Sequence, residues 1–297
     1  MSFVMEHLSG NHVAHLRAYF SRTARRLACL LTVICGIAAN AQGLDSLSLS
    51  SYKLELYAGA KYVGSATGFV VKHEGSLYLI TNWHVVTGRD RWTDSLISIT
   101  KADTIAVWFQ AKTKDTIALT WVRERMPLYG SDSLPLWHEH PSGRRVDVVA
   151  LEIEPDSTKI VRAIDLRSAD ADVWVRVAMN VSVIGFPRGL EGGGKLPIWK
   201  SGQLASEPEV DFRNDPTMLI DVRTIEGMSG SPAFLRIYGG YWNMHAGFDV
   251  GKTGTRFLGV YSGRVPVELA DKATRSDLGI IWKPIVIEEI LDGIGKK

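Results

Sequence analysis

The hexapeptide Gly227-Met228-Ser229-Gly230-Ser231-Pro232 places a serine between small residues. Glycine next to a serine allows the backbone to turn sharply and to direct N–H groups toward a bound carbonyl oxygen. The segment therefore predicts a nucleophilic hydroxyl at Ser229, although glycine and serine tracts are also typical of ordinary turns. Which interpretation holds depends on whether the rest of the chain supplies a base for that hydroxyl.

A histidine and an aspartate upstream complete such a set. The segment Thr81-Asn82-Trp83-His84-Val85 follows a β-favouring apolar run and presents a histidine, the usual general base for a serine nucleophile. Asp147 lies in the apolar segment 146–153, where a buried carboxylate needs a partner. Orienting the imidazole of His84 is one solution, and an ion pair with Arg144 or Arg145 is the alternative. The chain order His84, Asp147, Ser229 is that of one of the convergent catalytic triads.

Several stretches around these residues resemble one family. Residues 64–71 read GSATGFVV, 79–85 LITNWHV, 147–151 DVVAL, 183–189 VIGFPRG, 201–204 SGQL and 258–263 LGVYSG, and the nucleophile segment extends over 221–234. Together they resemble the trypsin-like (chymotrypsin-fold) serine peptidases of the bacterial kind, close to the HtrA-type and glutamyl endopeptidase groups.

The resemblance implies an all-β fold of two six-stranded antiparallel β-barrels with the active-site cleft between them. His84 and Asp147 are expected from the first barrel and Ser229 from the second, with a linker near residues 156–172. The implied activity is that of a serine endopeptidase, in which Ser229 forms an acyl-enzyme, His84 carries the proton and Asp147 orients the imidazole. The N–H groups of Gly227 and Ser229 are the implied oxyanion donors.

The resemblance also indicates which residues contact substrate, and where this chain departs from the pattern. Met228 stands where zymogen-type enzymes carry an aspartate, so activation by that buried ion pair is not expected. Arg223 and Thr224, six and five residues before the nucleophile, correspond to the primary pocket. Tyr261, Ser262 and Gly263 correspond to the strand that pairs with substrate. On this strand Tyr261 stands where glutamyl endopeptidases have a histidine.

The role of Arg223 is open at this point. Inside the pocket, its guanidinium would favour an acidic side chain before the scissile bond. Strand alternation equally allows Arg223 to face solvent, which is the more common position of an arginine on a strand. The residue preference of the pocket therefore stays undecided.

Short apolar runs with turn residues between them predict β structure along most of the chain. The runs are residues 52–57, 69–72, 77–81, 105–109, 116–122, 173–184 and 218–222. The last stretch, residues 284–294, has apolar residues at helical spacing and predicts a C-terminal helix.

The N-terminal residues 1–41 are predicted to be a signal peptide with an extended basic region. Basic residues precede an apolar run that is too short to span a bilayer, and Ala39-Asn40-Ala41 then forms a cleavage site before Gln42. The peptidase domain would comprise residues 42–297, in a secreted or periplasmic protein without stable membrane insertion. The alternative is a membrane anchor that is never removed.

Composition agrees with a globular enzyme outside the cytoplasm. Both cysteines of the chain lie within residues 1–41, so the mature protein would contain no thiol. Residues 42–297 carry 30 basic and 31 acidic side chains, a balance that gives no support for nucleic-acid binding. No zinc-ligand spacing occurs, and neither a metal nor another cofactor is expected.

Protein or peptide substrates are the expected partners, and the oligomeric state is not predicted. A second function class also stays open, because a fold does not guarantee its chemistry. The chain could be a catalytically idle binding or regulatory domain on the same fold.

Overall fold

The computed structural model describes residues 43–97, 100–112, 119–166, 172–269 and 272–295. The chain divides into two units, Met1–Ser46 and Leu47–Lys297, and the architecture below is that of the second unit. The predicted signal peptide, residues 1–41, lies outside the described residues. None of the helices among the described residues is long and apolar enough to cross a membrane.

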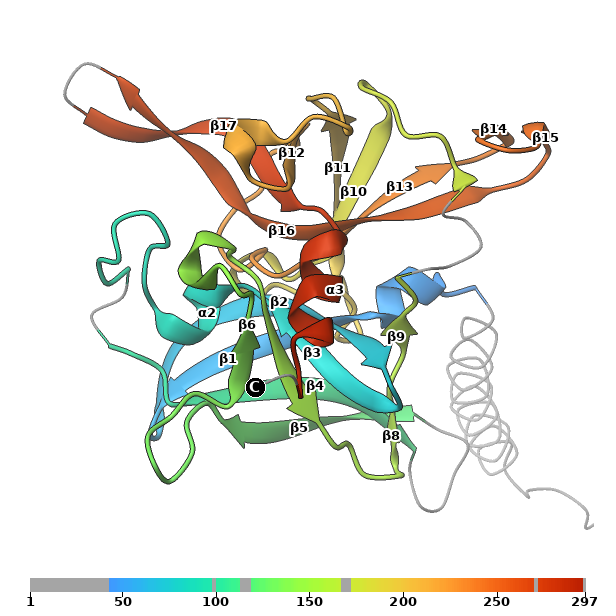
Figure 1. Ribbon diagram of the computed structural model, residues 1–297. Helices are drawn as coiled ribbons and strands as arrows, with labels where there is room; N and C mark the ends of the chain where they lie inside the picture. The colour runs from blue at the N-terminus through green and yellow to red at the C-terminus, as the bar shows by residue number, and fades with distance from the viewer. Residues whose placement is uncertain (1–42, 98–99, 113–118, 167–171, 270–271, 296–297) are drawn as a thin grey trace, which may run out of the picture. The chain divides into compact units, whose positions relative to one another are not determined.

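The N-terminal half of this unit forms a nine-stranded sheet (Figure 1). Its order is β5-β4-β1-β2-β3-β7-β6, while β8 pairs with β4, and β9 pairs with β2 in the parallel direction. The bounds are β1 Ser51–Ala58, β2 Lys61–His73, β3 Ser76–Thr81, β4 Thr104–Lys112, β5 Leu119–Pro127, β6 Trp137–Glu139, β7 Val149–Ile153, β8 Lys159–Ile160 and β9 Ala163–Ile164.

The C-terminal half forms a closed six-stranded barrel in the order β10-β11-β12-β17-β16-β13. A separate hairpin, β14 with β15, extends from the barrel (Figure 1). The bounds are β10 Asn180–Gly185, β11 Ile198–Leu204, β12 Thr217–Asp221, β13 Pro232–Ile237, β14 Gly240–Asn243, β15 Gly247–Val250, β16 Gly254–Leu269 and β17 Lys272–Trp282.

Helical structure is sparse among the described residues. The one-turn helix α2 spans Trp83–Thr87 and the C-terminal helix α3 spans Ile285–Asp292, with short 3₁₀ turns η1 Ser46–Leu49, η2 Gly143–Arg145, η4 Pro187–Gly189 and η5 Phe212–Asn214. Helix α3 forms where the sequence predicts it, because Val286, Ile287, Ile290 and Leu291 repeat at helical spacing and are buried.

One apolar cluster joins the sheet, the barrel and α3 into a common core. Phe69 on β2, Phe234 on β13 and Phe257 on β16 meet there. The ring centroid of Phe257 lies 5.4 Å from that of Phe69 and 5.5 Å from that of Phe234. Ile287 and Ile290 of α3 belong to the same cluster. Because this shared core fixes the sheet against the barrel, side chains from the two halves keep a defined separation at their junction.

The all-β class, the six-stranded barrel and the C-terminal helix predicted from the sequence are confirmed. The N-terminal sheet differs in detail from the predicted six-stranded barrel, because it has nine strands and one parallel pair. Two of the additional strands, β8 and β9, have two residues each and lie within the predicted linker, residues 156–172. Two-residue strands are too short to produce a readable alternation.

Candidate active site

Helix α2 presents His84 at the end of β3. The helix begins directly after Asn82 and ends at Gly88, whose left-handed φ of 66° closes the turn. Trp83, Val85 and Val86 are buried, and His84 lines the larger cavity at the junction of sheet and barrel. The Asn82 side chain donates to the backbone carbonyl of Asp147 at 2.6 Å, which ties α2 to the segment before β7.

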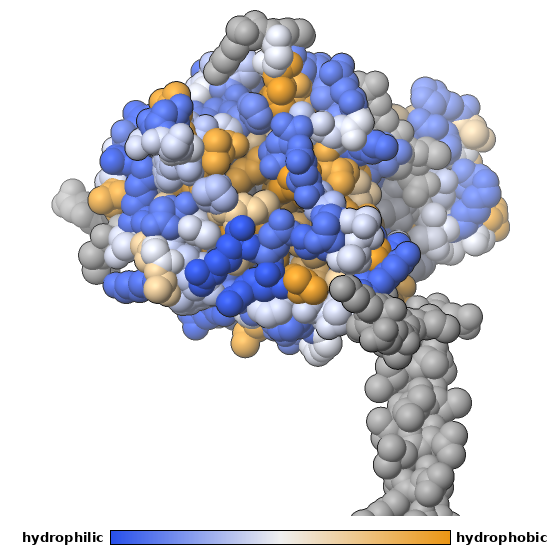
Figure 2. All heavy atoms as spheres, turned by 90° about the horizontal axis from the view of Figure 1, so that it is seen from below, coloured by the Kyte–Doolittle hydropathy of each residue, from blue (hydrophilic) through white to orange (hydrophobic). Residues whose placement is uncertain are grey.

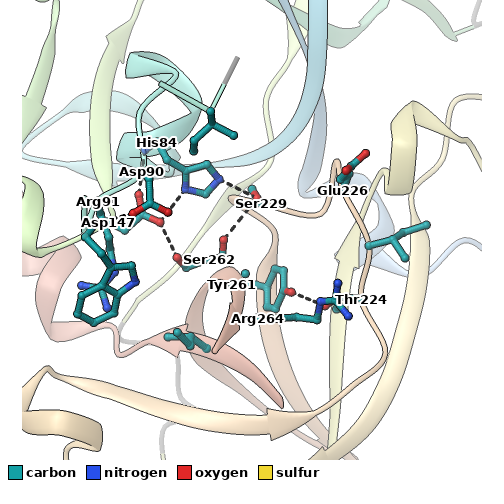
Figure 3. A pocket seen from close by; sticks show the side chains of 15 residues that line it. His84, Asp90, Arg91, Asp147, Thr224, Glu226, Ser229, Tyr261, Ser262 and Arg264 are labelled. Atoms are coloured by element: carbon teal, nitrogen blue, oxygen red, sulfur yellow. Dashed lines mark hydrogen bonds and ion pairs between the residues drawn. The ribbon is translucent and has the colours of Figure 1, made fainter. Parts of the chain in front are cut away.

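The structure brings His84, Asp147 and Ser229 into one hydrogen-bonded series (Figure 3). His84 Nδ1 lies 2.7 Å from Asp147 Oδ2, and His84 Nε2 lies 2.9 Å from Ser229 Oγ. The imidazole thus bridges a carboxylate of the N-terminal half and a hydroxyl of the barrel. This is the arrangement in which a histidine can accept a serine proton while its other nitrogen is held by an acid.

Asp147 is buried and accepts further hydrogen bonds. The His84 backbone N–H donates to Oδ1 at 2.9 Å, and Ser262 Oγ donates to Oδ2 at 2.5 Å. The predicted alternative, an ion pair with Arg144 or Arg145, does not form, because these arginines contact other carboxylates. Arg144 contacts Asp94 at 3.0 Å and Arg145 contacts Asp215 at 2.9 Å.

Arg91 is a buried cation near this carboxylate that the sequence analysis missed. Burial lowers its pKa, and the nearby charges of Asp147 and Asp215 oppose that shift. The guanidinium lies 3.3 Å from Asp215 and 3.5 Å from the centre of the Trp92 ring. No local sequence pattern marks Arg91, so only the fold reveals its contact with Asp215.

The turn before Ser229 depends on glycine. Gly227 has φ +88°, and a Cβ there would lie 2.5 Å from the Phe186 carbonyl oxygen and 2.6 Å from the Arg188 nitrogen. The Glu226 carbonyl accepts a hydrogen bond from the Arg188 N–H at 2.6 Å. Since the described chain has no cis peptide, the N–H of Gly227 is directed opposite to that carbonyl, away from Arg188.

The nucleophile segment is also fastened to β2 of the sheet. The Thr67 N–H donates to the Ser229 carbonyl at 2.9 Å, and Thr67 Oγ1 donates to the Gly227 carbonyl at 2.8 Å. Gly230 faces the same residue, and a Cβ there would lie 2.1 Å from the Thr67 carbonyl oxygen. The second glycine of the hexapeptide is therefore required for close approach of two backbones.

A cavity of about 360 Å³ opens beside Ser229. Four of the predicted substrate-contacting residues line it, namely Thr224, Tyr261, Ser262 and Gly263. Thr224 Oγ1 and the Tyr261 hydroxyl are hydrogen-bonded to each other and buried. A second, smaller cavity of about 220 Å³ also borders Ser229, and Leu56, Val63 and Val85 form an apolar part of its wall.

Arg223 does not lie where the pocket interpretation placed it. Its side chain is exposed, and it is not among the residues lining either cavity. Residues 221–224 alternate between exposed and buried, so Thr224 faces inward and its neighbour Arg223 faces solvent. The arginine that does line the larger cavity is Arg264 on β16, which the sequence analysis did not single out.

Among the residues that the structure describes, no group of three or more His, Cys, Asp and Glu side chains could hold a metal ion.

Comparison with known proteins gives one family match. A family model described as trypsin-like peptidase domain matches residues 66–239, which include His84, Asp147 and Ser229. A comparison with curated proteins gives no match.

Solved structures of several proteins are similar to the chain at low identity. The inactive form of a mutant of Rv3671c from M. tuberculosis H37Rv is 17% identical, with a TM-score of 0.41 over 85% of this chain and 89% of that chain. The protease Anisep from Arthrobacter nicotinovorans is 13% identical, with a TM-score of 0.44 over 84% and 96% of the two chains. The thermostable serine protease AL20 from an extremophilic microorganism is 11% identical, with a TM-score of 0.45 over 85% and 100%.

The family model covers more than half of the 297 residues. The protein therefore belongs to the trypsin-like peptidase domain family and is a serine endopeptidase of that family.

Proposed function

We propose that the protein hydrolyses peptide bonds of protein or peptide substrates with Ser229 as nucleophile and His84 as general base, through an acyl-enzyme. One observation carries the proposal: the imidazole of His84 lies between Asp147 and Ser229, at 2.7 Å and 2.9 Å. A serine hydroxyl is a weak nucleophile until a base in hydrogen-bond contact removes its proton.

In the first half of the reaction, Ser229 Oγ attacks the scissile carbonyl carbon while its proton passes to His84 Nε2. The carbonyl oxygen becomes an oxyanion, which the N–H groups of Gly227 and Ser229 stabilise. The C–N bond then breaks as His84 returns the proton to the leaving amine. In the second half, water replaces the amine, and its attack on the acyl ester releases the acid and restores Ser229.

Asp147 holds the imidazole of His84 in the tautomer that these reaction steps need. With its carboxylate accepting from Nδ1–H, Nε2 is left without a proton and is free to accept one. The carboxylate then stabilises the imidazolium that forms during attack. Ser262 and the backbone N–H of His84 keep the carboxylate in position.

The test is the Ser229→Ala variant, assayed on a protein substrate such as casein and with a fluorophosphonate label. We expect wild-type protein to cleave and to be labelled at Ser229, and the variant to lose both, because triad knockouts retain only about 10³-fold catalysis over water. A matched control is Ser182→Ala, which removes a hydroxyl from β10 that pairs with Ser201 at 2.9 Å. Undiminished turnover in Ser229→Ala, or no labelling of wild type, would show that the chain is a binding domain or uses other groups.

The proposal extends to export of the protein. A basic segment, an apolar run and the Ala39-Asn40-Ala41 site support a secreted or periplasmic location after cleavage of residues 1–41. N-terminal sequencing of protein recovered from the periplasm or medium should give Gln42 as the first residue. An intact residue 1–41 segment on membrane-associated protein would instead support the anchored alternative.

A further inference from the structure

Arg264 lines the larger cavity near Thr224 and Tyr261 (Figure 3), and its position results from an irregularity in β16. Tyr261 pairs with Ile281 of β17 while Gly263 pairs with Ile280, so two residues of β16 oppose a single step of β17. This is a β-bulge at Ser262, which changes the face that later side chains occupy.

The bulge puts Arg264 on the same face as Tyr261. Arg264 is opposite Gly279, and Tyr261 is opposite Ile281. Gly279 and Ile281 are two residues apart and share one face of β17, and directly opposed residues share a face as well. Arg264 is three positions after Tyr261 along β16, a spacing that in a regular strand would put the two side chains on opposite faces. The bulge therefore aims the arginine into the cavity.

Gly279 leaves the space that the Tyr261 ring needs. A Cβ at this position would lie 2.8 Å from Cε2 of Tyr261, so any larger residue would crowd the ring. The neighbouring residue Ile280 also lines the cavity. In Figure 3 the side chain of Arg264 extends in the direction of Thr224.

Arg264 forms an ion pair that is largely exposed. Its Nη1 lies 3.6 Å from Asp277 Oδ1, and the two side chains are 39% and 87% exposed. Exposed pairs of this kind contribute about 0 to 1 kcal/mol, so loss of the Asp277 contact on substrate binding costs little.

Three of the other charged groups that line this cavity have contacts of their own. Asp147 is bound by His84 and Ser262, and Arg91 is bound by Asp215. Asp90 accepts from the backbone N–H groups of the turn that follows it. Glu226 is exposed and lines both cavities, as His84 and Ser229 do.

We propose that Arg264 recognises the side chain before the scissile bond, and that the substrates are polypeptides cleaved after glutamate or aspartate. The inference rests on the proposed function. A guanidinium can bind a carboxylate through two parallel hydrogen bonds, and the Thr224 and Tyr261 hydroxyls supply further polar contacts at the same end of the cavity.

The experiment compares three peptides that differ only in the residue before the cleaved bond: glutamate, glutamine or lysine. Wild-type protein should have a higher kcat/KM for the glutamate peptide than for the glutamine peptide. Arg264→Ala should lower that ratio by roughly 10- to 100-fold, with little change on the glutamine peptide, because a hydrogen bond to a charged group is lost. Arg264→Lys should restore part of the ratio, since it keeps the charge but not the two-point geometry.

Two further variants locate the effect. Lys72→Ala removes an exposed cation of β2 outside both cavities, and the ratio should stay at the wild-type value. Arg223→Ala tests the other arginine directly. If Arg223→Ala lowers the ratio and Arg264→Ala does not, or if wild type prefers the lysine peptide, the assignment to Arg264 is wrong.

Fluorophosphonate labelling of each variant separates this inference from the proposed function. If the wild-type protein and the variants are labelled and cleave the glutamine peptide, but the wild type shows no preference for glutamate, only the role of Arg264 is overturned. A wild-type protein that is folded, yet neither labelled nor active on any of the three peptides, overturns both.

Discussion

At the scale of single residues, Asp147 is the proposed catalytic group whose hydrogen bonds most restrict the choice of side chain. It is buried and accepts from the His84 ring, the His84 backbone N–H and Ser262. Asp147→Asn keeps the shape but offers an N–H₂ group where an acceptor is needed, which favours the wrong imidazole tautomer. We expect kcat to fall by roughly 10⁴-fold with the fold retained, measured by peptide turnover and circular dichroism. A variant that remains fully active, or one that unfolds with no separable catalytic defect, would make Asp147 a structural residue.

The sequence analysis identifies some of these residues and misses others for a physical reason. His84 and Ser229 lie in local patterns that constrain the backbone around them, so they can be recognised without the fold. Ser262 was assigned to substrate contact, but its hydroxyl binds Asp147, 115 residues away. The bulge beside it depends on pairing with β17, which no local pattern records. For the same reason Arg223 was considered for the pocket and Arg264 was not.

At the scale of elements, the turn from Glu226 to Ser229 aligns one proposed oxyanion donor. Gly227→Ala would set a Cβ 2.5 Å from the Phe186 carbonyl oxygen at a φ of +88°, so the turn must reorganise. We expect kcat to fall by roughly 10²- to 10³-fold, as for loss of one oxyanion donor, while the barrel still folds. Gly59→Ala is the control, because its φ is +58° and a Cβ there meets nothing within 4 Å. Equal kcat values for the two variants would contradict the assignment.

Another element-scale contact, between β1 and the segment before β9, should make stability depend on alkaline pH. The Tyr52 hydroxyl accepts from the Arg162 N–H at 2.8 Å, and burial raises the pKa of Tyr52 from 10.0 to about 12. Below pH 10 the stabilisation is complete, and it is lost as pH rises toward 12, since the unfolded chain releases the proton first. Urea unfolding should show a loss of about 1 kcal/mol at pH 11 that Tyr52→Phe lacks. Tyr62→Phe, at a 52% exposed side chain, should behave as wild type, and an unchanged pH slope in Tyr52→Phe would contradict the prediction.

Element boundaries were predictable where a strand or helix buries one regular face. Strands β1 and β3 and helix α3 follow their sequence patterns closely. The predicted run 173–184 is a strand only from Asn180 onward. Val173 and Val175 are buried in the barrel core although they lie outside a strand, so an apolar pattern there reflects burial and not β structure. A run of apolar residues predicts which side chains are buried, but it does not predict which backbone segments pair through hydrogen bonds.

At the scale of the whole molecule, a buried ion cluster connects the two halves near the proposed catalytic groups. Asp215, which precedes β12 of the barrel, lies 3.3 Å from Arg91 and 2.9 Å from Arg145. Arg91 follows α2, and Arg145 ends the 3₁₀ turn η2, both in the N-terminal half. Asp215 and Arg91 are each only 7% exposed, so removing the carboxylate leaves a buried guanidinium with less compensation. Arg91 also lies near Asp147, whose charge acts on it, and it contacts the Arg145 carbonyl at 2.6 Å.

Asp215→Asn should therefore destabilise the fold by about 3 kcal/mol, because breaking one side of a buried pair leaves an uncompensated charge. The measurement is urea unfolding followed by tryptophan fluorescence at pH 7. Asp249→Asn, which breaks the exposed pair with Lys252 at 2.8 Å, should leave the unfolding midpoint unchanged. In the double variant Asp215→Asn with Arg91→Met, part of the lost stability should return, because the stranded cation is then gone. Equal stability of the single and double variants would mean that Arg91 is sufficiently solvated without Asp215, and that the shared apolar core alone holds the halves together.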